Sequence, residues 1–386
     1  MTTSNVDERH AVLAELLRRN HDGFDVRYGT CYTNHTVHTL YALADLGADQ
    51  ECLRRFYGAR RDRLRKQIPP KLTITDENWD RHFGDPANYS AYLVYFDAKV
   101  EKLGLDDAFN RYVPKVLAGI LGAVGHPLIH LGFALGHRDP MVLAEALAFA
   151  CAAEKSTIGM ADAEYRGVGK RGDIILHIKE ALADITNDVR LDPFAWQSDQ
   201  IMDILIPLYE QHGPVVAEYF NRVAIEEGEP LVDQLVRLAT EVFIDAARDG
   251  LFDFFLVHAI TTAHALHIIA PRLDNSDLAR LLRGYWLYLL MVYICQGRPP
   301  LVHFGPIPDA PSWAQITKSV MADEDEHTPK LVVTWREAAK REQAASHGDD
   351  VWWRSVAAAV VTTIHQEKQW NFRGIGKTLP SLHASL

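Results

Sequence analysis

Tyr285-Trp286-Leu287-Tyr288-Leu289-Leu290-Met291-Val292-Tyr293-Ile294-Cys295 is the longest apolar run in the chain. It is too short to cross a bilayer as a helix, which takes about 20 residues. The run instead extends a helical pattern that starts at Asp277, with Ser276 as a candidate N-cap and Gly297-Arg298-Pro299 as a stop signal. We therefore expect a helix buried in the core and no interaction with membranes.

Helical periodicity continues on both sides of this run. Apolar residues recur at three- and four-residue spacing in stretches 12–17, 37–44, 116–121 and 231–242, as on one face of an amphipathic helix. Patterns with the period of a β-strand are nearly absent. The chain is therefore expected to be all-α, with roughly twelve or more helices. The main irregular segments are 68–79, 167–173, 191–196 and the proline-rich stretch 299–312.

Composition limits the classes of function. The 386 residues are 48% hydrophobic, which is enough for a large core, and carry a net charge of −11. An acidic chain lacks the basic face that nucleic acids and anionic membranes attract, so small molecules are the expected ligands. Cys31, Cys52, Cys151 and Cys295 are dispersed and form no CxxC pair. Without a secretory signal pattern at the N-terminus, we expect reduced thiols in a cytoplasmic protein.

Four segments concentrate the histidines of this chain. They are Asn34-His35-Thr36-Val37-His38, Gly125-His126-Pro127-Leu128-Ile129-His130, the stretch from His258 to His264, and Asp325-Glu326-His327-Thr328-Pro329-Lys330. Asn34 is a good N-cap and Pro127 a favoured first helical residue, so both segments place histidines at helix starts. His258 lies in an apolar helix, where a neutral imidazole needs a partner.

A single histidine on a helix is more often a hydrogen-bonded structural residue than a metal ligand. The set as a whole is harder to explain in that way, because hydrogen bonding in a core does not require so many imidazoles. Neutral imidazole binds iron, zinc, copper and nickel, and facing helices often supply such sites. We therefore expect the segments to converge on a mononuclear metal in a central cavity that also holds the substrate.

These segments carry a resemblance to the questin oxidase-like family. Asn34-His35 followed by Leu46-Gly47-Ala48, the stretch from His126 to Gly132, His258-Ala259-Ile260-Thr261, Gly297-Arg298-Pro299 and Asp325-Glu326-His327 with Lys330 resemble the family's motifs in the same order. The resemblance extends from about residue 25 to about residue 340. It favours one helical domain over residues 1–386, in which residues 341–386 form a helical extension.

The resemblance implies an oxygenase that uses dioxygen to open a ring of an aromatic polyketide such as an anthraquinone. It further implies Fe(II) held by histidines and a carboxylated lysine. Carried over to this sequence, the metal ligands are His35, His126, His258, His327 and Lys330. His38, His130 and His264 then surround the metal or the substrate.

Lys330 can join such a site only if its charge is removed. A protonated lysine has no lone pair and is repelled by a cation. Burial can lower the pKa of the amine, which can then capture carbon dioxide as a carbamate, an anionic oxygen ligand. The alternative is an ordinary helix-end salt bridge with Glu326. Arg298 is a further candidate, because its permanently charged guanidinium could hold a phenolate or an oxyanion.

Other functions stay open at this point. A zinc-dependent hydrolase could use the same histidines, and a helical binding protein would need no metal. An NADPH-dependent oxidase without metal is also possible, but Gly167-Val168-Gly169-Lys170-Arg171-Gly172 follows a polar stretch that is not strand-like, so it does not predict a dinucleotide site. The sequence does not indicate the oligomeric state.

Overall fold

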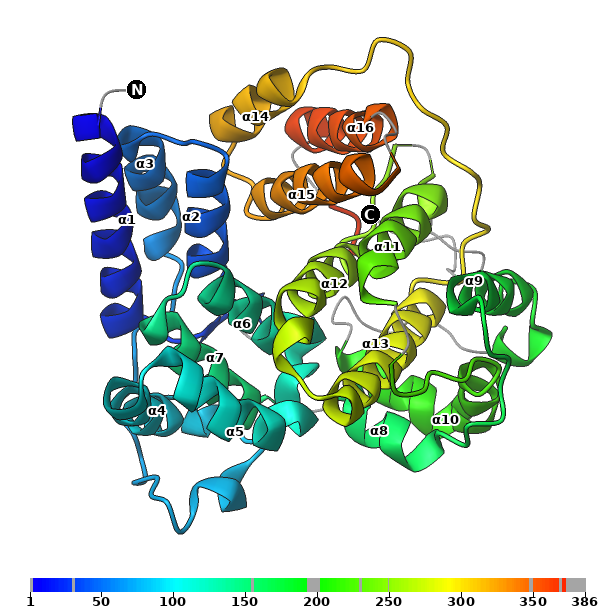
Figure 1. Ribbon diagram of the computed structural model, residues 1–386, viewed down its shortest axis with the longest axis horizontal. Coiled ribbons are helices and arrows are strands. Elements are labelled where there is room, and N and C mark those ends of the chain that lie inside the picture. Colours follow the sequence, from blue (N-terminus) through cyan, green and yellow to red (C-terminus); the bar gives the residue numbers. More distant parts are fainter. Residues whose placement is uncertain are drawn as a thin grey trace, which may run out of the picture.

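Helices make up nearly all the regular structure (Figure 1), which confirms the all-α class. The computed structural model describes residues 3–29, 32–153, 156–192, 202–228, 231–248, 250–346, 350–367 and 370–372. In these ranges the one sheet is an antiparallel pair of two-residue strands, Arg27–Tyr28 and Tyr32–Thr33.

The described residues contain sixteen α-helices and five short 3-10 helices. The α-helices are α1 (Thr3–Gly23), α2 (Thr36–Asp45), α3 (Gln50–Arg61), α4 (Tyr89–Leu103), α5 (Leu105–Ile120), α6 (His126–Gly136), α7 (Pro140–Ala152), α8 (Thr157–Glu164), α9 (Ile174–Ile185), α10 (Met202–Phe220), α11 (Val232–Ala246), α12 (Leu256–Ile269), α13 (Asn275–Cys295), α14 (Trp313–Ala322), α15 (Thr328–Ser346) and α16 (Val351–Glu367). The 3-10 helices are Trp79–His82, Pro86–Asn88, Ala123–Gly125, Val189–Leu191 and Ala270–Arg272.

Helix α13 is the core helix expected from the apolar run. Every side chain from Tyr285 to Cys295 is at most 2% exposed, and α5, α8, α10 and α12 pack against it. Among the described helices it alone is long and apolar enough to cross a membrane, yet 83% of its apolar window is buried in the protein. The predicted N-cap is wrong: Asp274, not Ser276, accepts a hydrogen bond from the backbone N–H of Asp277. A carboxylate is as good an acceptor there as a hydroxyl.

The irregular segments largely match the expectation. Residues 299–312 form no helix or strand, and the glycine-rich stretch 167–172 follows helix α8 rather than a strand. This confirms that the glycine-rich stretch lacks the structural context of a dinucleotide fingerprint. Residues 193–196 of the predicted loop 191–196 lie outside the described residues, as does Cys31; the other three cysteines are free and buried.

Four helices meet near the middle of the molecule and position the histidine segments (Figure 1). Helix α6 packs against α12, and α2 packs against both α6 and α15. The approach of α6 to α12 depends on Gly132, because a Cβ atom there would lie 2.7 Å from Cβ of Ala265. Beyond residue 340, α16 packs on α14 and α15. The buried apolar side chains form a continuous cluster from α1 to α16.

Candidate metal centre

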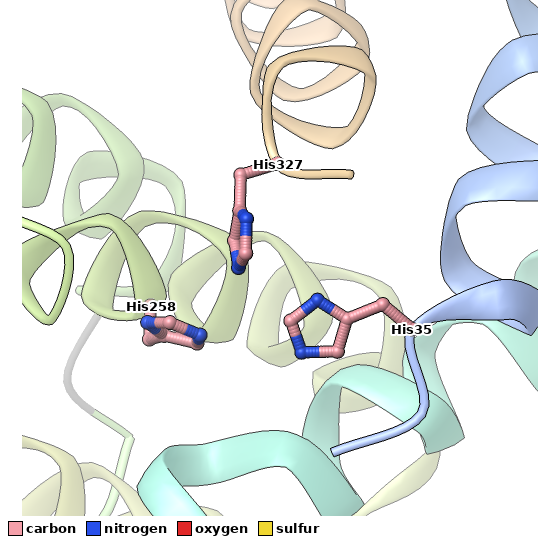
Figure 2. A group of neighbouring side chains, drawn as sticks. All are labelled: His35, His258 and His327. Atoms are coloured by element: carbon pink, nitrogen blue, oxygen red, sulfur yellow. The ribbon is translucent and has the colours of Figure 1, made fainter. Parts of the chain in front are cut away.

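The four predicted histidine ligands lie together where four helices begin. His35 directly precedes α2, His126 is the first residue of α6, His258 lies in the first turn of α12, and His327 directly precedes α15. All four side chains are at most 5% exposed. Figure 2 shows His35, His258 and His327 directed toward a common space.

The nitrogens of three of these histidines lie close enough together for a single ion. One ligand atom each from His35, His258 and His327 lies within 4.8 Å of the others. Nε2 of His126 lies 2.7 Å from Nε2 of His35. Nitrogens bound to one ion at about 2.1 Å can be at most about 4.2 Å apart, so small movements would bring His35, His258 and His327 onto one metal, whereas His126 contacts this group through His35.

Short local contacts fix the backbone at each histidine. The Asn34 side chain accepts from the N–H of Thr36 at 3.0 Å at the start of α2. The Asp253 carboxylate accepts from the N–H groups of Phe255 and Leu256, which begins α12 one turn before His258. The Asp325 carboxylate accepts from the N–H of His327 at 2.9 Å and from the next N–H along the chain. The predicted N-cap Asn34 is wrong by one residue: the N-caps of α2 and α12 are His35 and Phe255, and neither forms a side-chain capping bond. Asn34 and Asp253 instead precede these N-caps and accept from nearby backbone N–H groups.

Hydrogen bonds to backbone carbonyls set the tautomers of two of the histidines. Nδ1 of His258 donates to the carbonyl of Phe254 at 2.9 Å, and Nδ1 of His126 donates to the carbonyl of Ala123. Each ring therefore keeps a lone pair on Nε2, the arrangement that metal-binding histidines use. Nε2 of His258 and Nε2 of His327 are buried and form no hydrogen bond. Two imidazole nitrogens that could bind a metal are thus buried here without a hydrogen-bond partner.

Lys330 lies at the same place, one helical turn into α15. Its side chain is 2% exposed, and Nζ lies 3.1 Å from Nδ1 of His35. Burial lowers the pKa of Lys330 to about 8, against the opposing charges of Glu326 and Asp325. The carboxylate of Glu326 lies 3.6 Å from Nδ1 of His35. The exposed salt bridge that was the alternative for Lys330 is therefore not what the structure contains.

The protonation of His35 depends on Lys330. A lysine ammonium is only a donor, so it requires a lone pair on Nδ1 of His35. The proton of His35 then lies on Nε2 and is donated to the lone pair of His126 Nε2. With Lys330 charged, Nε2 of His35 is therefore protonated and has no lone pair for a metal.

The electrostatics of the cluster keep the rings neutral. Burial is the main cause that lowers the pKa of His35, His258 and His327 well below the ordinary value and that of His126 to about 3. The nearby charge of Lys330 lowers all four further. The partial positive charge of four helix N-termini acts in the same direction and favours an anion at this place.

A chain of buried hydrogen bonds leads away from the cluster. Nε2 of His38 lies 2.9 Å from Nδ1 of His130, and Nε2 of His130 lies 2.6 Å from the carboxylate of Glu145. Glu145 also bonds His21 at 2.8 Å, and His21 bonds the partly exposed Asp97 at 3.2 Å. The rings of His38 and His35 have centroids 5.8 Å apart. His38 therefore lies next to the cluster and His130 lies behind His38, and the roles predicted for both stay predictions.

A cavity of about 400 Å³ adjoins the cluster between α6, α12 and α15. Its lining includes Lys330, His264 and the apolar side chains of Ile129, Phe133 and Ile268. Phe133 stacks on His38 with ring centroids 5.4 Å apart. This volume is in the range of small-molecule sites, so the predicted combination of a histidine cluster and an adjoining cavity is present.

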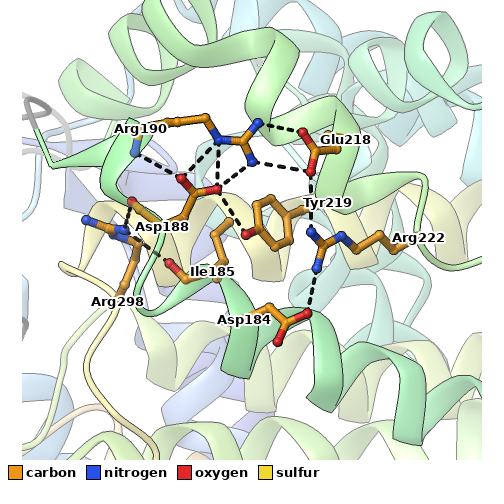
Figure 3. Close-up of polar contacts among 8 residues, drawn as sticks. All are labelled: Asp184, Ile185, Asp188, Arg190, Glu218, Tyr219, Arg222 and Arg298. Carbon is orange, nitrogen blue, oxygen red and sulfur yellow. Dashed lines mark hydrogen bonds and ion pairs between the residues drawn. The ribbon is translucent and has the colours of Figure 1, made fainter.

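The Arg298 side chain binds the end of α9 and the turn after it, and Figure 3 shows its contacts with Ile185 and Asp188. Its guanidinium donates to the carbonyls of Ile185 and Asp188, at 3.1 and 2.6 Å, and to the carboxylate of Asp192 at 2.8 Å. The side chain is 3% exposed and holds the end of α9 against the turn that follows α13. These contacts assign Arg298 a structural role, and its catalytic role stays a prediction.

Sequence reasoning missed two residues next to the centre. Glu145 is the one charged residue of the apolar helix α7, and it is 3% exposed. A lone carboxylate in such a helix signals a buried partner, and this signal could have drawn attention to it. Arg341 borders the cavity but stands in an ordinary charged stretch of α15, where the sequence offers no signal.

Comparisons with known proteins show the family of this chain. The model of the questin oxidase-like family matches residues 32–334. The chain belongs to the questin oxidase-like family. It is 26% identical to the Baeyer-Villiger monooxygenase AacuH of Aspergillus aculeatus over 65% of this chain and 60% of that protein. It is 24% identical to a questin oxidase of Aspergillus terreus over 82% of this chain and 78% of that protein.

A third relative is the Baeyer-Villiger oxidase mdpL of Emericella nidulans, 22% identical over 92% of this chain and 88% of that protein. The family match and these oxidase relatives identify the chain as an oxidoreductase. They confirm the resemblance read from the histidine segments, with family limits close to those expected. The names of the relatives specify no cofactor.

Proposed function

We propose that this questin oxidase-like protein is a non-haem iron oxygenase that cleaves a ring of an aromatic polyketide, such as an anthraquinone, with dioxygen. One observation carries the proposal: His35, His126, His258, His327 and Lys330 come from four helices and meet in one buried place. Relatives named as Baeyer-Villiger oxidases and questin oxidases support the reaction class.

The donor set fits a metal ion. The bare Nε2 atoms of His258 and His327 cost free energy in the absence of a partner, and a metal would satisfy both. His126 already presents the lone pair of Nε2. Imidazole suits iron as well as zinc, copper and nickel, and an oxidase reaction like those named for the relatives needs a redox-active metal, for which we propose iron. When bound, iron supplies the redox partner that dioxygen needs to react with an organic substrate.

Carboxylation of Lys330 would complete the site. An amine with its pKa lowered to about 8 is neutral far more often than an ordinary lysine, and only the neutral form captures carbon dioxide. The carbamate is an acceptor, so His35 would carry its proton on Nδ1 and donate it in a hydrogen bond to the carbamate, which leaves the Nε2 lone pair of His35 free for the metal. Four helix N-termini favour the added negative charge.

The remaining side chains would shape the reaction space. Ile129, Phe133 and Ile268 line the cavity beside Lys330 and would exclude water from a flat apolar substrate. His38 would fix the orientation of its neighbours through the hydrogen bond to His130.

Metal analysis and oxygen uptake test the proposal. The protein would be purified without added metal, stripped with EDTA, reloaded with Fe(II) or Zn(II), and supplied with 1,8-dihydroxyanthraquinone with and without NADPH. We expect about one iron per chain, and oxygen uptake that needs Fe(II) but not NADPH. His258→Ala would lose both iron and uptake. The matched control is His365→Ala, because His365 is exposed on α16 and pairs with Asp323.

Each competing function has a distinct outcome in this experiment. Zinc-supported hydrolysis without oxygen uptake would indicate a hydrolase. Uptake by the stripped protein with NADPH alone would indicate a metal-free oxidase. Absence of stoichiometric metal, with ligand binding unaffected by His258→Ala, would indicate a binding protein.

A further inference from the structure

The wall of the cavity beside Lys330 contains a cation, Arg341, that forms no direct ion pair and has one guanidinium nitrogen without a hydrogen bond. Arg341 lies on α15, three turns after Lys330, and borders the cavity. Its Nη2 atom is buried and forms no hydrogen bond. An unpaired guanidinium in a partly apolar place is costly, because guanidinium groups at such positions normally find an acceptor.

Apart from Lys330, the other charged groups around the cavity are paired among themselves. Arg336 lies 3.8 Å from the carboxylate of Glu337 and donates from Nη2 to the carbonyl of Asp45, although its Nε atom is buried without a hydrogen bond. His137 bonds Asp45 at 3.2 Å. His267, in the wall next to Arg341, bonds Asp233 at 2.9 Å. Among the described residues of the cavity wall, Arg341 and Lys330 are the two cations that form no direct ion pair. Burial lowers the pKa of Arg341, and the nearby charges of Asp233, Glu337 and Glu342 oppose this effect.

A second unpaired group lies beside Arg341. His264 also lines the cavity, and its buried Nδ1 atom forms no hydrogen bond. Burial, and then the charge of Arg341, lower the pKa of His264 to about 3, so the ring is neutral. A permanent cation and a neutral imidazole with a free ring nitrogen form a set that an anionic oxygen would satisfy.

The rest of the wall suits a flat aromatic body. Phe133 stacks nearly parallel with His137, at an interplanar angle of 8°, and with His38 at 14°. Ile129 and Ile268 supply further apolar surface. Lys330 borders the same cavity, so a ligand held there would lie next to the histidine cluster.

We infer that Arg341 and His264 form an anion-binding subsite, and that the cavity takes a planar aromatic ligand with an ionised phenol or carboxylate at the end away from Lys330. This inference rests on the proposed function only in identifying that ligand as the substrate. Arg341 also borders a second cavity, on the side of α11, where Lys179 and Arg237 both pair with Glu241. The test therefore has to establish which cavity is used.

Binding of a matched pair of probes tests the inference without turnover. Anthraquinone-2-carboxylate and the neutral anthraquinone-2-carboxamide have the same shape and differ in charge. Each would be titrated into the full chain under nitrogen, with calorimetry or tryptophan fluorescence as the readout, before and after removal of metal by EDTA. We expect the carboxylate to bind about ten- to a hundredfold more tightly than the carboxamide in both states.

Variants locate the subsite. Arg341→Met is expected to abolish the preference for the carboxylate and leave carboxamide binding unchanged, and Arg341→Lys to retain part of it. Arg336→Met is the matched control, because Arg336 lies on the same helix and is already paired. Ile268→Trp narrows the cavity beside Lys330 and should therefore weaken the binding of both probes. Equal melting temperatures would show that all variants are folded.

Three results would overturn the inference. They are an unchanged carboxylate preference in Arg341→Met, a carboxylate preference that disappears on removal of metal, and tight binding that survives Ile268→Trp. Because no result depends on oxygen uptake, the subsite could fail while the proposed oxygenase function stands, and the reverse is equally possible.

Discussion

At the scale of single residues, burial decides the chemistry of this protein more than residue type does. Lys330 and Lys340 lie on the same helix, but only Lys330 is buried, beside His35, whereas the side chain of Lys340 is 59% exposed. Desolvation lowers the pKa of Lys330 to about 8. A neutral amine can react and accept a proton, and an exposed ammonium cannot.

Lys330→Ala should therefore lose bound iron by more than about tenfold, because it removes the group that would take the Nδ1 proton of His35. Metal content after dialysis, measured by mass spectrometry, gives the answer. Lys340→Ala is the matched control, since Lys340 pairs only with Glu337 at the surface. Equal iron in wild type and Lys330→Ala would remove Lys330 from the site.

Arg298→Met separates a structural from a catalytic role. The substitution removes a buried cation and leaves the carbonyls of Ile185 and Asp188 without their donor. We expect a loss of about 1.5–3 kcal/mol in the free energy of unfolding, with metal content unchanged. Arg190→Met is the control in the same network (Figure 3), where the 47% exposed arginine should contribute at most about 1 kcal/mol.

A stable Arg298→Met variant with lost turnover would contradict the structural role. It would instead support the catalytic role that the sequence predicted. Urea denaturation and oxygen uptake together distinguish these two results.

At the scale of helices, the centre depends on how closely α6 and α12 pack, because one carries His126 and the other His258. Gly132 permits this approach: a Cβ atom there would lie 2.7 Å from Cβ and 2.9 Å from Cα of Ala265. Such distances leave no room for a methyl group without a shift of one helix.

Gly132→Ala should consequently cost about 1–3 kcal/mol of stability and weaken metal binding as the two histidines separate. Gly136→Ala is the matched control one turn further along α6, where the added Cβ would meet only Ile268 Cδ1 at 3.9 Å. Thermal unfolding and metal titration would be compared for both. If both variants retained metal affinity equally, helix spacing would not set the site.

At the scale of the whole molecule, the buried pair of His21 and Glu145 ties α1 to α7 and, through Asp97, to α4. Burial alone would lower the pKa of His21, but hydrogen bonds from its ring to Asp97 and Glu145 outweigh it and raise the pKa to about 10. Burial alone would raise the pKa of Glu145, but the bonds to His130 and His21 lower it to about 2.

The sign of the pH dependence follows from these shifts. The contribution of His21 to the free energy of unfolding is complete at pH values below its ordinary pKa, near 6.5, and is lost as the pH rises toward 10. The contribution of Glu145 to the free energy of unfolding is complete at pH values above its ordinary pKa of 4.5 and is lost as the pH falls toward 2. Between pH 4.5 and pH 6.5, Glu145→Gln should lower the free energy of unfolding by about 3–5 kcal/mol, and outside this range by progressively less. A pH-independent difference between wild type and variant in urea denaturation would contradict this assignment.

The helical architecture, the buried helix α13, the places of His35 and His126 at helix starts and the family could all be predicted from the amino-acid sequence, whereas His258 was expected inside a helix and lies in the first turn of α12. These features depend on residues a few positions apart, which periodicity and capping report directly. The N-cap of α13 was predicted wrongly because Asp274 and Ser276 are both good N-cap residues and lie only two positions apart.

The contacts between residues far apart in the chain could be learned only from the folded protein. His35 and Lys330 are 295 positions apart, and nothing local specifies that their nitrogens lie at 3.1 Å. The same holds for the engagement of Arg298 with α9 and for the unpaired state of Arg341. Contacts of this kind arise from the packing of whole helices, whose apolar faces do not encode their partners, so the charge state of Lys330 follows only from the assembled fold.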